Sequence, residues 1–155
     1  MDMNRKQHGA ALVELALVLP LLLLATFITT EYSRALYQYN VLAKSVRDAA
    51  RYLSTQTPGD TSKYATARNL AVYGNPAGNG SPLALGLTVG HVATPVWQTV
   101  GTSPVVNTVT VQIGDVPGGI VANVYTFTPM FSSVFGTTFG SATFAPIRVT
   151  MRAAL

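Results

Sequence analysis

The sequence predicts an α+β protein in which a long N-terminal helix, a short second helix and a C-terminal antiparallel β-sheet follow one another. Three observations support this fold class. The chain begins with a long apolar run, continues with apolar residues at helical spacing, and after residue 83 turns to alternating Val, Thr and Phe. Neither part closes a core alone, so we expect the sheet to pack on the amphipathic part of the first helix.

The first element is an apolar run over residues 10–30, in which Glu14 is the one ionisable side chain. A helix over this run is about 31 Å long, which matches the hydrocarbon core of a bilayer. Basic side chains before the run favour a cytoplasmic N-terminus: Arg5, Lys6 and His8. We therefore predict a single transmembrane helix over residues 10–31, followed by an extracytoplasmic domain over residues 32–155.

A secretory signal peptide is the alternative interpretation of the same run. Signal peptides have an apolar region of about 7–15 residues that ends in a small-x-small cleavage site. Here the run is longer, and the candidate triplet Ala25-Thr26-Phe27 ends in a bulky residue. The transmembrane helix is the better prediction.

Two residues inside the run interrupt its apolar character. Glu14 lies about 6 Å from the start by helical rise, near the interface, where a carboxylate costs less than at the bilayer centre. It either reaches the headgroups or pairs with a cation inside the membrane. Pro20 lacks the N–H that would bond to the carbonyl of Ala16, so we expect a helix kink, either a generic bend or a hinge.

The helix is predicted to continue beyond the membrane as an amphipathic segment over residues 32–53 and to end before Pro58-Gly59. A second helix over residues 61–73 follows, with Asp60 or Thr61 as its N-cap and Gly74 as its C-cap.

The remainder, residues 83–155, is predicted to be β-rich. Clear alternation marks three strands, and two weaker strands are expected; in chain order the five cover residues 83–89, 96–100, 105–113, 120–128 and 145–151. Gly118-Gly119 suits a turn between strands, and residues 128–141 are expected to form a long apolar loop. That loop carries apolar side chains that either fill the core or form an exposed contact patch for neighbouring subunits: Met130, Phe131, Val134, Phe135 and Phe139.

Composition argues against several function classes. The 155 residues include 10 Lys and Arg, 6 Asp and Glu and no Cys, which excludes a disulfide framework and thiolate zinc sites. The high apolar content excludes intrinsic disorder. Thirteen of the sixteen charged residues precede residue 69, and four basic ones share a predicted helix face with Asp48, so we expect no nucleic-acid partner despite the net charge of +4.

Catalytic constellations are also missing from the predicted external domain. Between residues 69 and 147 the acidic and imidazole side chains are Asp115 and His91 alone. They fall short of a zinc set, no Gly-x-Ser-x-Gly elbow accompanies them, and no glycine-rich phosphate loop is present. We expect no enzymatic activity and no cofactor, and interpret His91 as a strand-end residue.

The N-terminal third resembles a known family. Residues 9–20, GAALVELALVLP, are followed by a Leu run, then by Glu31-Tyr32, and further on by VRDAARY at residues 46–52. This arrangement resembles the start of TadE-like proteins, which are pilin-like components of tight-adherence (Tad, type IVc) pilus systems. The β-rich remainder matches that family only in general character.

The resemblance implies that a prepilin peptidase removes the basic leader, residues 1–9, by cutting between Gly9 and Ala10. It also implies that Glu14, then the fifth residue, serves subunit assembly by pairing with the free amine of Ala10 on a neighbouring subunit. The implied function is that of a non-enzymatic minor pseudopilin of the inner membrane, which acts in pilus assembly for adhesion and stays there or enters the pilus or its tip. Its implied partners are other pilin-like subunits, the prepilin peptidase and the inner-membrane assembly machinery.

Two alternatives remain open. One is a pseudopilin of a related secretion system, and the other is an uncleaved single-span binding module of the envelope.

Overall fold

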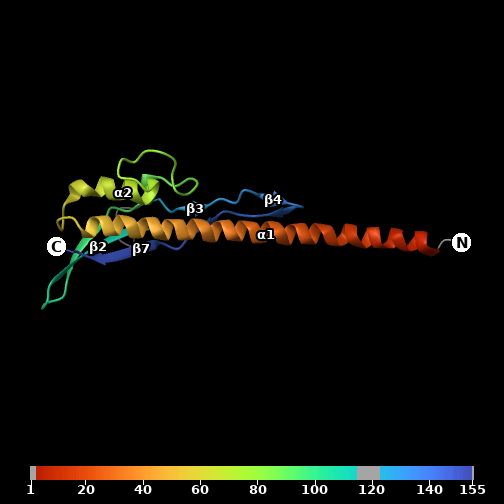
Figure 1. Cartoon of the computed structure of the whole chain (residues 1–155), viewed down its shortest axis with the longest axis horizontal. Coiled ribbons are helices and arrows are strands. Elements are labelled where there is room, and N and C mark those ends of the chain that lie inside the picture. The colour runs from red at the N-terminus through yellow and green to blue at the C-terminus, as the bar shows by residue number, and fades with distance from the viewer. Residues whose placement is uncertain (1–2, 115–122, 155) are drawn as a thin grey trace. The chain divides into compact units, whose positions relative to one another are not determined.

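The computed structural model describes residues 3–114 and 123–154. These residues form two compact units: one contains the chain up to Leu36 together with Thr128–Ser141, and the other contains Tyr37–Phe127 and Ala142–Leu155 as far as they are described. The first helix, α1 (Met3–Ser54), contributes to both (Figure 1). From Gly9 onward α1 is long and apolar enough to cross a membrane, with a mean hydropathy of 2.5 over an 18-residue window.

The predicted α+β fold class is confirmed. A 3-10 turn over Thr61–Lys63 leads into α2 (Tyr64–Tyr73). The turn is capped by Asp60, whose carboxylate accepts the Ser62 N–H at 2.9 Å. Gly74 ends α2 in the left-handed conformation (φ 71°), and its N–H bonds to the Leu70 carbonyl. Gly74 is the C-cap predicted from the sequence, whereas Asp60, predicted with Thr61 as a possible N-cap of the second helix, caps the 3-10 turn, and Lys63 stands at the N-cap of α2 without a side-chain hydrogen bond.

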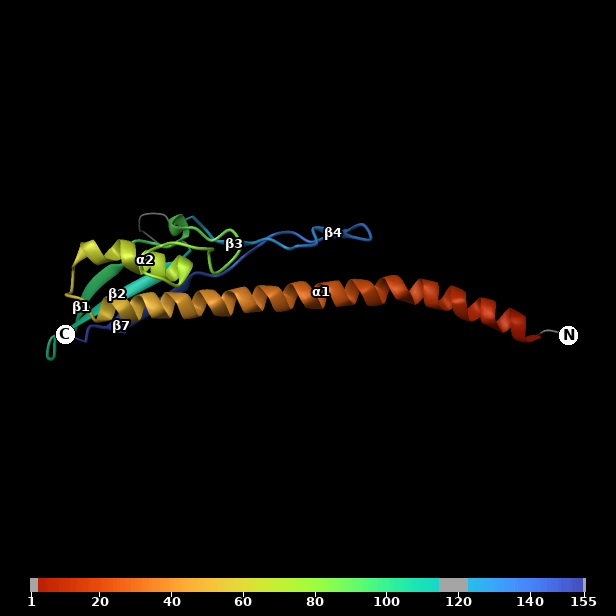
Figure 2. The ribbon, with the colours of Figure 1, turned by 45° about the horizontal axis from the view of Figure 1, so that its top comes forward.

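The larger unit holds an antiparallel sheet with the strand order β1-β2-β7, made of β1 (Val96–Val100), β2 (Val106–Ile113) and β7 (Ile147–Arg152). Figures 1 and 2 show the C-terminal part of α1 beside α2 and this sheet. A two-stranded ladder, β3 (Thr126–Phe127) with β6 (Ala142–Thr143), belongs to the same unit.

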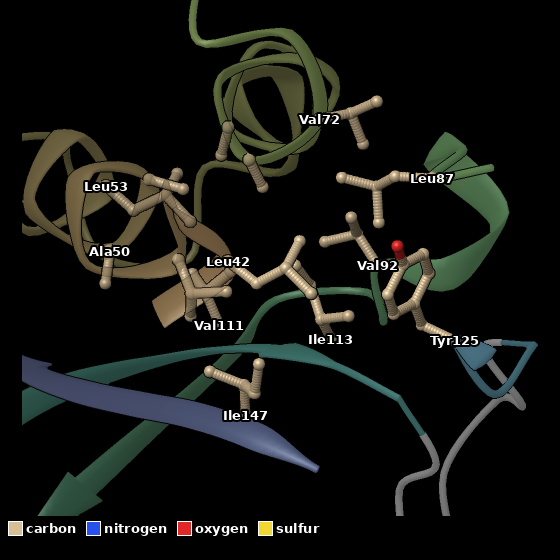
Figure 3. Close-up of a cluster of buried hydrophobic side chains, with 14 of the residues drawn as sticks. Leu42, Ala50, Leu53, Val72, Leu87, Val92, Val111, Ile113, Tyr125 and Ile147 are labelled. Atoms are coloured by element: carbon tan, nitrogen blue, oxygen red, sulfur yellow. The ribbon is translucent and has the colours of Figure 1, made fainter. Parts of the chain in front are cut away.

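The core of this unit lies between the C-terminal part of α1, α2 and the sheet (Figure 3). Apolar residues at helical spacing on α1, such as Leu42, Val46 and Leu53, are fully buried, as are Val109 and Val111 at the two-residue spacing of β2. The apolar residues whose spacing predicted the helix and the strand are therefore the ones that are buried between α1 and β2.

One predicted strand is wrong: residues 83–89 form turns, and a 3-10 helix, η2 (Val89–His91), follows. Gly86 takes a φ of 76°, which breaks an extended chain, and the buried side chains Ala84 and Leu87 are three residues apart rather than two. His91 consequently lies at the end of η2, not at a strand end.

The strand predicted over residues 120–128 is reduced to β3 in the described part, while residues 120–122, the Gly118-Gly119 turn and Asp115 lie outside the described residues.

The apolar loop predicted over residues 128–141 is also partly wrong, because its middle is a hairpin. Strand β4 (Ser133–Val134) pairs with β5 (Thr137–Thr138), and Phe135-Gly136 forms the turn between them. Both turn residues have positive φ, 49° and 80°, which is the geometry of a two-residue type I′ turn. Such turns usually carry Asn-Gly, so a pattern that relies on Asn-Gly does not predict a hairpin at the Phe-Gly pair.

Candidate functional site

The predicted processing and assembly residues lie close together near the start of α1. Gly9, Ala10 and Glu14 are all exposed, with Glu14 about one helical turn beyond Ala10. A Cβ atom added at Gly9 would meet no atom within 4 Å apart from its chain neighbours and the nearby backbone of its own helix. Pro20 is partly buried, and α1 continues through it as a helix. Cleavage at Gly9, pairing of Glu14 and a kink at Pro20 remain predictions.

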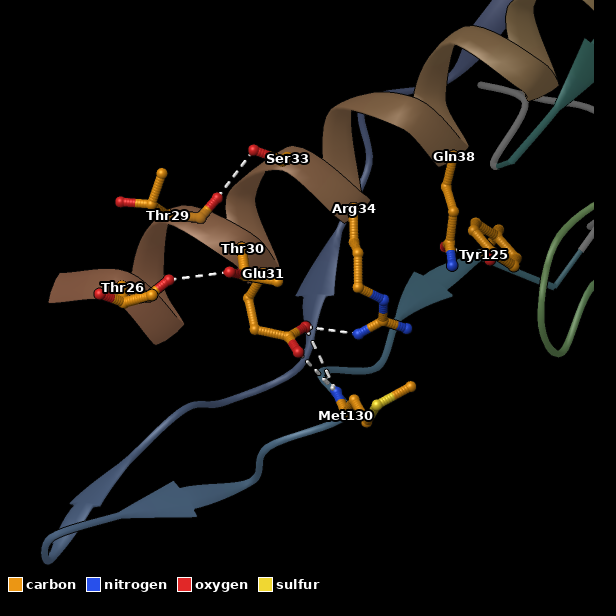
Figure 4. Close-up of polar contacts among 9 residues, drawn as sticks. All are labelled: Thr26, Thr29, Thr30, Glu31, Ser33, Arg34, Gln38, Tyr125 and Met130. Carbon is orange, nitrogen blue, oxygen red and sulfur yellow. Dashed lines mark hydrogen bonds and ion pairs between the residues drawn. The ribbon is translucent and has the colours of Figure 1, made fainter. Parts of the chain in front are cut away.

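Further along α1, four hydroxyl side chains satisfy their hydrogen bonds inside the helix. They donate to carbonyls one turn back: Thr26 to Leu22, Thr29 to Ala25, Thr30 to Thr26 and Ser33 to Thr29, at 2.8 to 2.9 Å. Two of these bonds are drawn in Figure 4. Because each hydroxyl has a partner within the helix, this stretch carries little desolvation cost in an apolar environment.

Immediately beyond the apolar run, Glu31 forms a buried polar contact with a segment almost a hundred residues away. Its side chain lies against Arg34, whose Nη1 donates to Oε2 at 2.6 Å. The backbone N–H of Met130 points at both carboxylate oxygens, 3.3 Å from each (Figure 4). Glu31 is only 6% exposed. A buried carboxylate is tolerable when it is paired and hydrogen-bonded, as it is here.

An aromatic contact lies beside this polar one. The rings of Phe27 and Phe131 are 4.8 Å apart, centre to centre, and tilted by 51°. Among the residues of the predicted contact patch, Phe131 is therefore packed against α1, whereas Met130 and Phe135 are 69% and 63% exposed. Val134 and Phe139 are half-buried. Contact of this patch with neighbouring subunits remains a prediction.

In the larger unit, Tyr125 makes a buried polar contact. Its hydroxyl lies 3.0 Å from Oε1 of Gln38 and 2.9 Å from the carbonyl of Leu85, and donates its proton to one of them at a time. Burial raises the pKa of Tyr125 above its ordinary value of 10.0. His91 meets the Tyr125 ring edge-on at 5.7 Å, and its Nδ1 accepts the backbone N–H of Thr88 at 2.9 Å. His91 thus closes the η2 turn.

Among the side chains of residues 9–114 and 123–154, no group of three or more His, Cys, Asp or Glu is placed to hold a metal ion.

The fold and these contacts define a class of protein: an α+β chain of pilin-like architecture, whose long N-terminal helix is apolar in its first part and packs against an antiparallel sheet in its last part. The TadE-like protein family model matches residues 9–51. The resemblance predicted from the sequence is confirmed over that segment. Searches of curated proteins and of solved structures gave no match.

Sequence reasoning missed the contact between Glu31 and Met130. The acceptor and the donor are 99 residues apart, and the donor is a backbone N–H, which any residue other than proline supplies. The available signal was Glu31 itself, a carboxylate at the outer end of an apolar run with Arg34 three residues later.

Proposed function

We propose that this protein is a non-enzymatic, membrane-anchored pilin-like component, a minor pseudopilin, that acts in the assembly of a Tad (type IVc) pilus for adhesion. The observation that carries the proposal is that the TadE-like match, residues 9–51, covers the apolar, membrane-length part of α1.

The first part of the proposal is the membrane anchor. α1 crosses the inner membrane over residues 10–31, with the N-terminus in the cytoplasm and residues 32–155 outside. Large apolar side chains in this stretch are exposed in the isolated chain, among them Leu12, Leu17 and Leu21 at 67 to 71%. When the helix enters lipid, these side chains leave water, and this transfer is favourable. The internally bonded hydroxyls extend this compatibility to Thr30.

The second part is processing by a prepilin peptidase, which removes residues 1–9 and leaves Ala10 as the new N-terminus. The ammonium group of Ala10 then lies in the apolar run, where it needs an anionic partner. Glu14 of a neighbouring pilin-like subunit supplies this partner during assembly. The helix surface around Glu14 is open in the isolated chain, which leaves room for such a neighbour.

The test is the N-terminal sequence of the mature protein, made with a C-terminal tag in cells that contain the cognate peptidase. We expect cleavage between Gly9 and Ala10 with retention in the membrane. Gly9→Leu should abolish cleavage, because the peptidase must approach the backbone closely. A Cβ atom added at Gly9 meets no atom of another part of the chain within 4 Å, so a backbone clash does not explain the loss. Ala16→Leu is the matched control: it adds similar apolar bulk to the exposed helix and should be cut normally.

Other outcomes would identify the alternatives. A soluble domain released after Ala25 would mean a secretory signal, and an uncut chain in wild-type cells would mean an envelope binding module. Correct processing, with loss of secretion but normal Tad pili when the gene is deleted, would mean a pseudopilin of a secretion system.

A further inference from the structure

The β4–β5 hairpin and its flanks form an uncharged, apolar surface. Residues 128–141 contain no Asp, Glu, Lys, Arg or His. Within them, Met130 and Phe135 are among the most exposed large apolar side chains outside the N-terminal run of α1. An exposed apolar surface of this kind marks an interaction site, because its contact with water is unfavourable.

The tip of the hairpin places a phenylalanine where one is rarely found. Phe135 has a φ of 49°, in the left-handed region, and is the one residue other than glycine with positive φ in the described chain. Asn, Asp or Gly adopts this conformation at less energetic cost. The hairpin instead has the bulky apolar ring of Phe135 at its tip, where the residue is 63% exposed. A strained and exposed ring of this kind indicates that the ring itself contacts a partner.

The position of the hairpin indicates which partner that is. Its base is fixed to α1 at two points, by Met130 N–H on the Glu31 carboxylate and by Phe131 on Phe27. Phe27 lies inside the predicted transmembrane segment, about 6 Å by helical rise before Glu31. Figure 4 shows the hairpin running from Met130 toward the end of the helix that carries Thr26. The tip is thus directed back toward the membrane level of α1.

We propose that the hairpin tip, residues 134–137, inserts into the outer interfacial region of the lipid bilayer beside α1. This inference rests on the membrane anchoring in the proposed function. The occupant is lipid, because the apolar surface of the hairpin is continuous with that of a helix segment immersed in lipid.

The backbone limits the depth of insertion. The hairpin strands bond to each other, and Phe139 N–H bonds to the Ser132 carbonyl, but the outer edges of a two-stranded ladder still need water or headgroups. The Ser and Thr hydroxyls of β4 and β5 suit the same level. Because Phe131 already packs on Phe27, about 6 Å inside the outer end of the predicted span, we place the Phe135 ring among the upper acyl chains of the outer leaflet, below the headgroups. Since the segment carries no charge, its insertion needs no anionic lipid.

The absence of cysteine from the chain permits a direct test. The full chain, reconstituted in vesicles of phosphatidylethanolamine and phosphatidylglycerol, carries one environment-sensitive fluorophore at Phe135→Cys. Two matched positions serve as references: Leu21→Cys, 67% exposed in the predicted membrane segment, and Leu85→Cys, 71% exposed in the other unit. At Phe135→Cys we expect a blue-shifted emission and iodide quenching several-fold weaker than at Leu85→Cys. Spin labels near the lipid headgroup should quench it more strongly than labels near the chain ends.

The outcomes separate this inference from the proposed function. If the Leu21→Cys probe is in lipid while the Phe135→Cys probe is quenched by iodide as fully as that at Leu85→Cys, the anchor stands and the lipid-bound hairpin is refuted. If the Phe135→Cys probe is shielded from iodide but insensitive to lipid spin labels, and shielding grows with the protein-to-lipid ratio, a second protein copy covers the tip and the inference is wrong. If the Leu21→Cys probe is itself in water, the anchor fails and the inference falls with it.

A second variant protects the test against a folding artefact. Phe135→Asn places a residue that favours the left-handed turn, so the hairpin should form at least as well. With the fluorophore at Val134→Cys, adding Phe135→Asn should raise iodide quenching several-fold if the ring holds the tip in lipid. Unchanged quenching would contradict that role of the ring.

Discussion

Two buried polar side chains, Glu31 and Tyr125, each connect parts of the chain that lie far apart in sequence. Glu31 accepts a hydrogen bond from Met130, and Tyr125 bonds to Gln38 or Leu85, 87 and 40 residues away. Buried polar groups of this kind favour one arrangement of their segments, because any other arrangement loses these long-range hydrogen bonds.

Tyr125→Phe should lower the free energy of unfolding by about 1 kcal/mol at neutral pH, since the carbonyl oxygens of Gln38 and Leu85 lose their shared donor. Burial raises the pKa of Tyr125 in the folded state above 10.0. The tyrosine's contribution is therefore complete below pH 10.0, the unfolded value, and is lost as the pH rises through the folded pKa. The difference between wild type and variant should shrink above pH 10.0.

Urea unfolding of the two proteins in detergent, at neutral pH and at alkaline pH, measures both effects. Tyr37→Phe removes a hydroxyl from a ring that is 70% exposed and should cost far less at neutral pH. Equal losses in the two variants would refute the role assigned to the Tyr125 hydroxyl.

At the scale of elements, α1 changes its surroundings along its length. Its N-terminal part exposes Leu and Val on all sides, whereas the part after Tyr37 has one face at or near zero exposure. The same helical geometry therefore carries two different side-chain patterns, and the sequence alone decides where the pattern changes.

Leu42→Ala tests the buried face of α1. Leu42 is fully buried opposite Ile113 and Ile147, so the variant should lose about 2–5 kcal/mol through lost burial and the cavity that remains. Leu36→Ala, in the same helix at 47% exposure, is the matched control and should lose much less. Thermal unfolding in detergent measures both, and similar midpoints for the two variants would contradict the core described here.

The sequence-based predictions are accurate where a feature depends on residues close in sequence and fail where it depends on distant ones. Strand β1 matches its predicted residues 96–100, and the Gly74 cap is correct, because alternation and glycine conformation are local properties. The β4–β5 hairpin was missed since its turn lacks Asn-Gly, and residues 83–89 fail as a strand because Gly86 adopts a left-handed φ. The site around Glu31 depends on a contact of long sequence separation, which no local pattern contains.

At the scale of the whole molecule, variants of Glu14, the lone carboxylate of the apolar run, test membrane anchoring and assembly separately. Glu14→Gln should retain membrane insertion, because a neutral amide enters lipid more easily than a carboxylate. Assembly should nevertheless fail, since in the proposed pairing the Ala10 ammonium of the neighbouring subunit is left without its anionic partner, at a cost of about 3–5 kcal/mol. Glu14→Asp should lie between the two, because it keeps the charge with a shorter reach.

Co-purification with partner pilins and counts of piliated cells measure assembly, and a membrane-fraction blot gives the protein level. Wild-type piliation by the Gln variant at an equal protein level would show that Glu14 merely reaches the headgroups.

The contact between Glu31 and Met130 also imposes an order in time. Glu31 leaves the ribosome 99 residues before its backbone donor, Met130. At ordinary rates of protein synthesis this separation corresponds to about 5–20 s. During that interval Arg34, three residues later, is the partner within reach of the carboxylate. The ion pair with Arg34 thus forms before the hairpin exists, and the hairpin docks on α1 only after Met130 has been made.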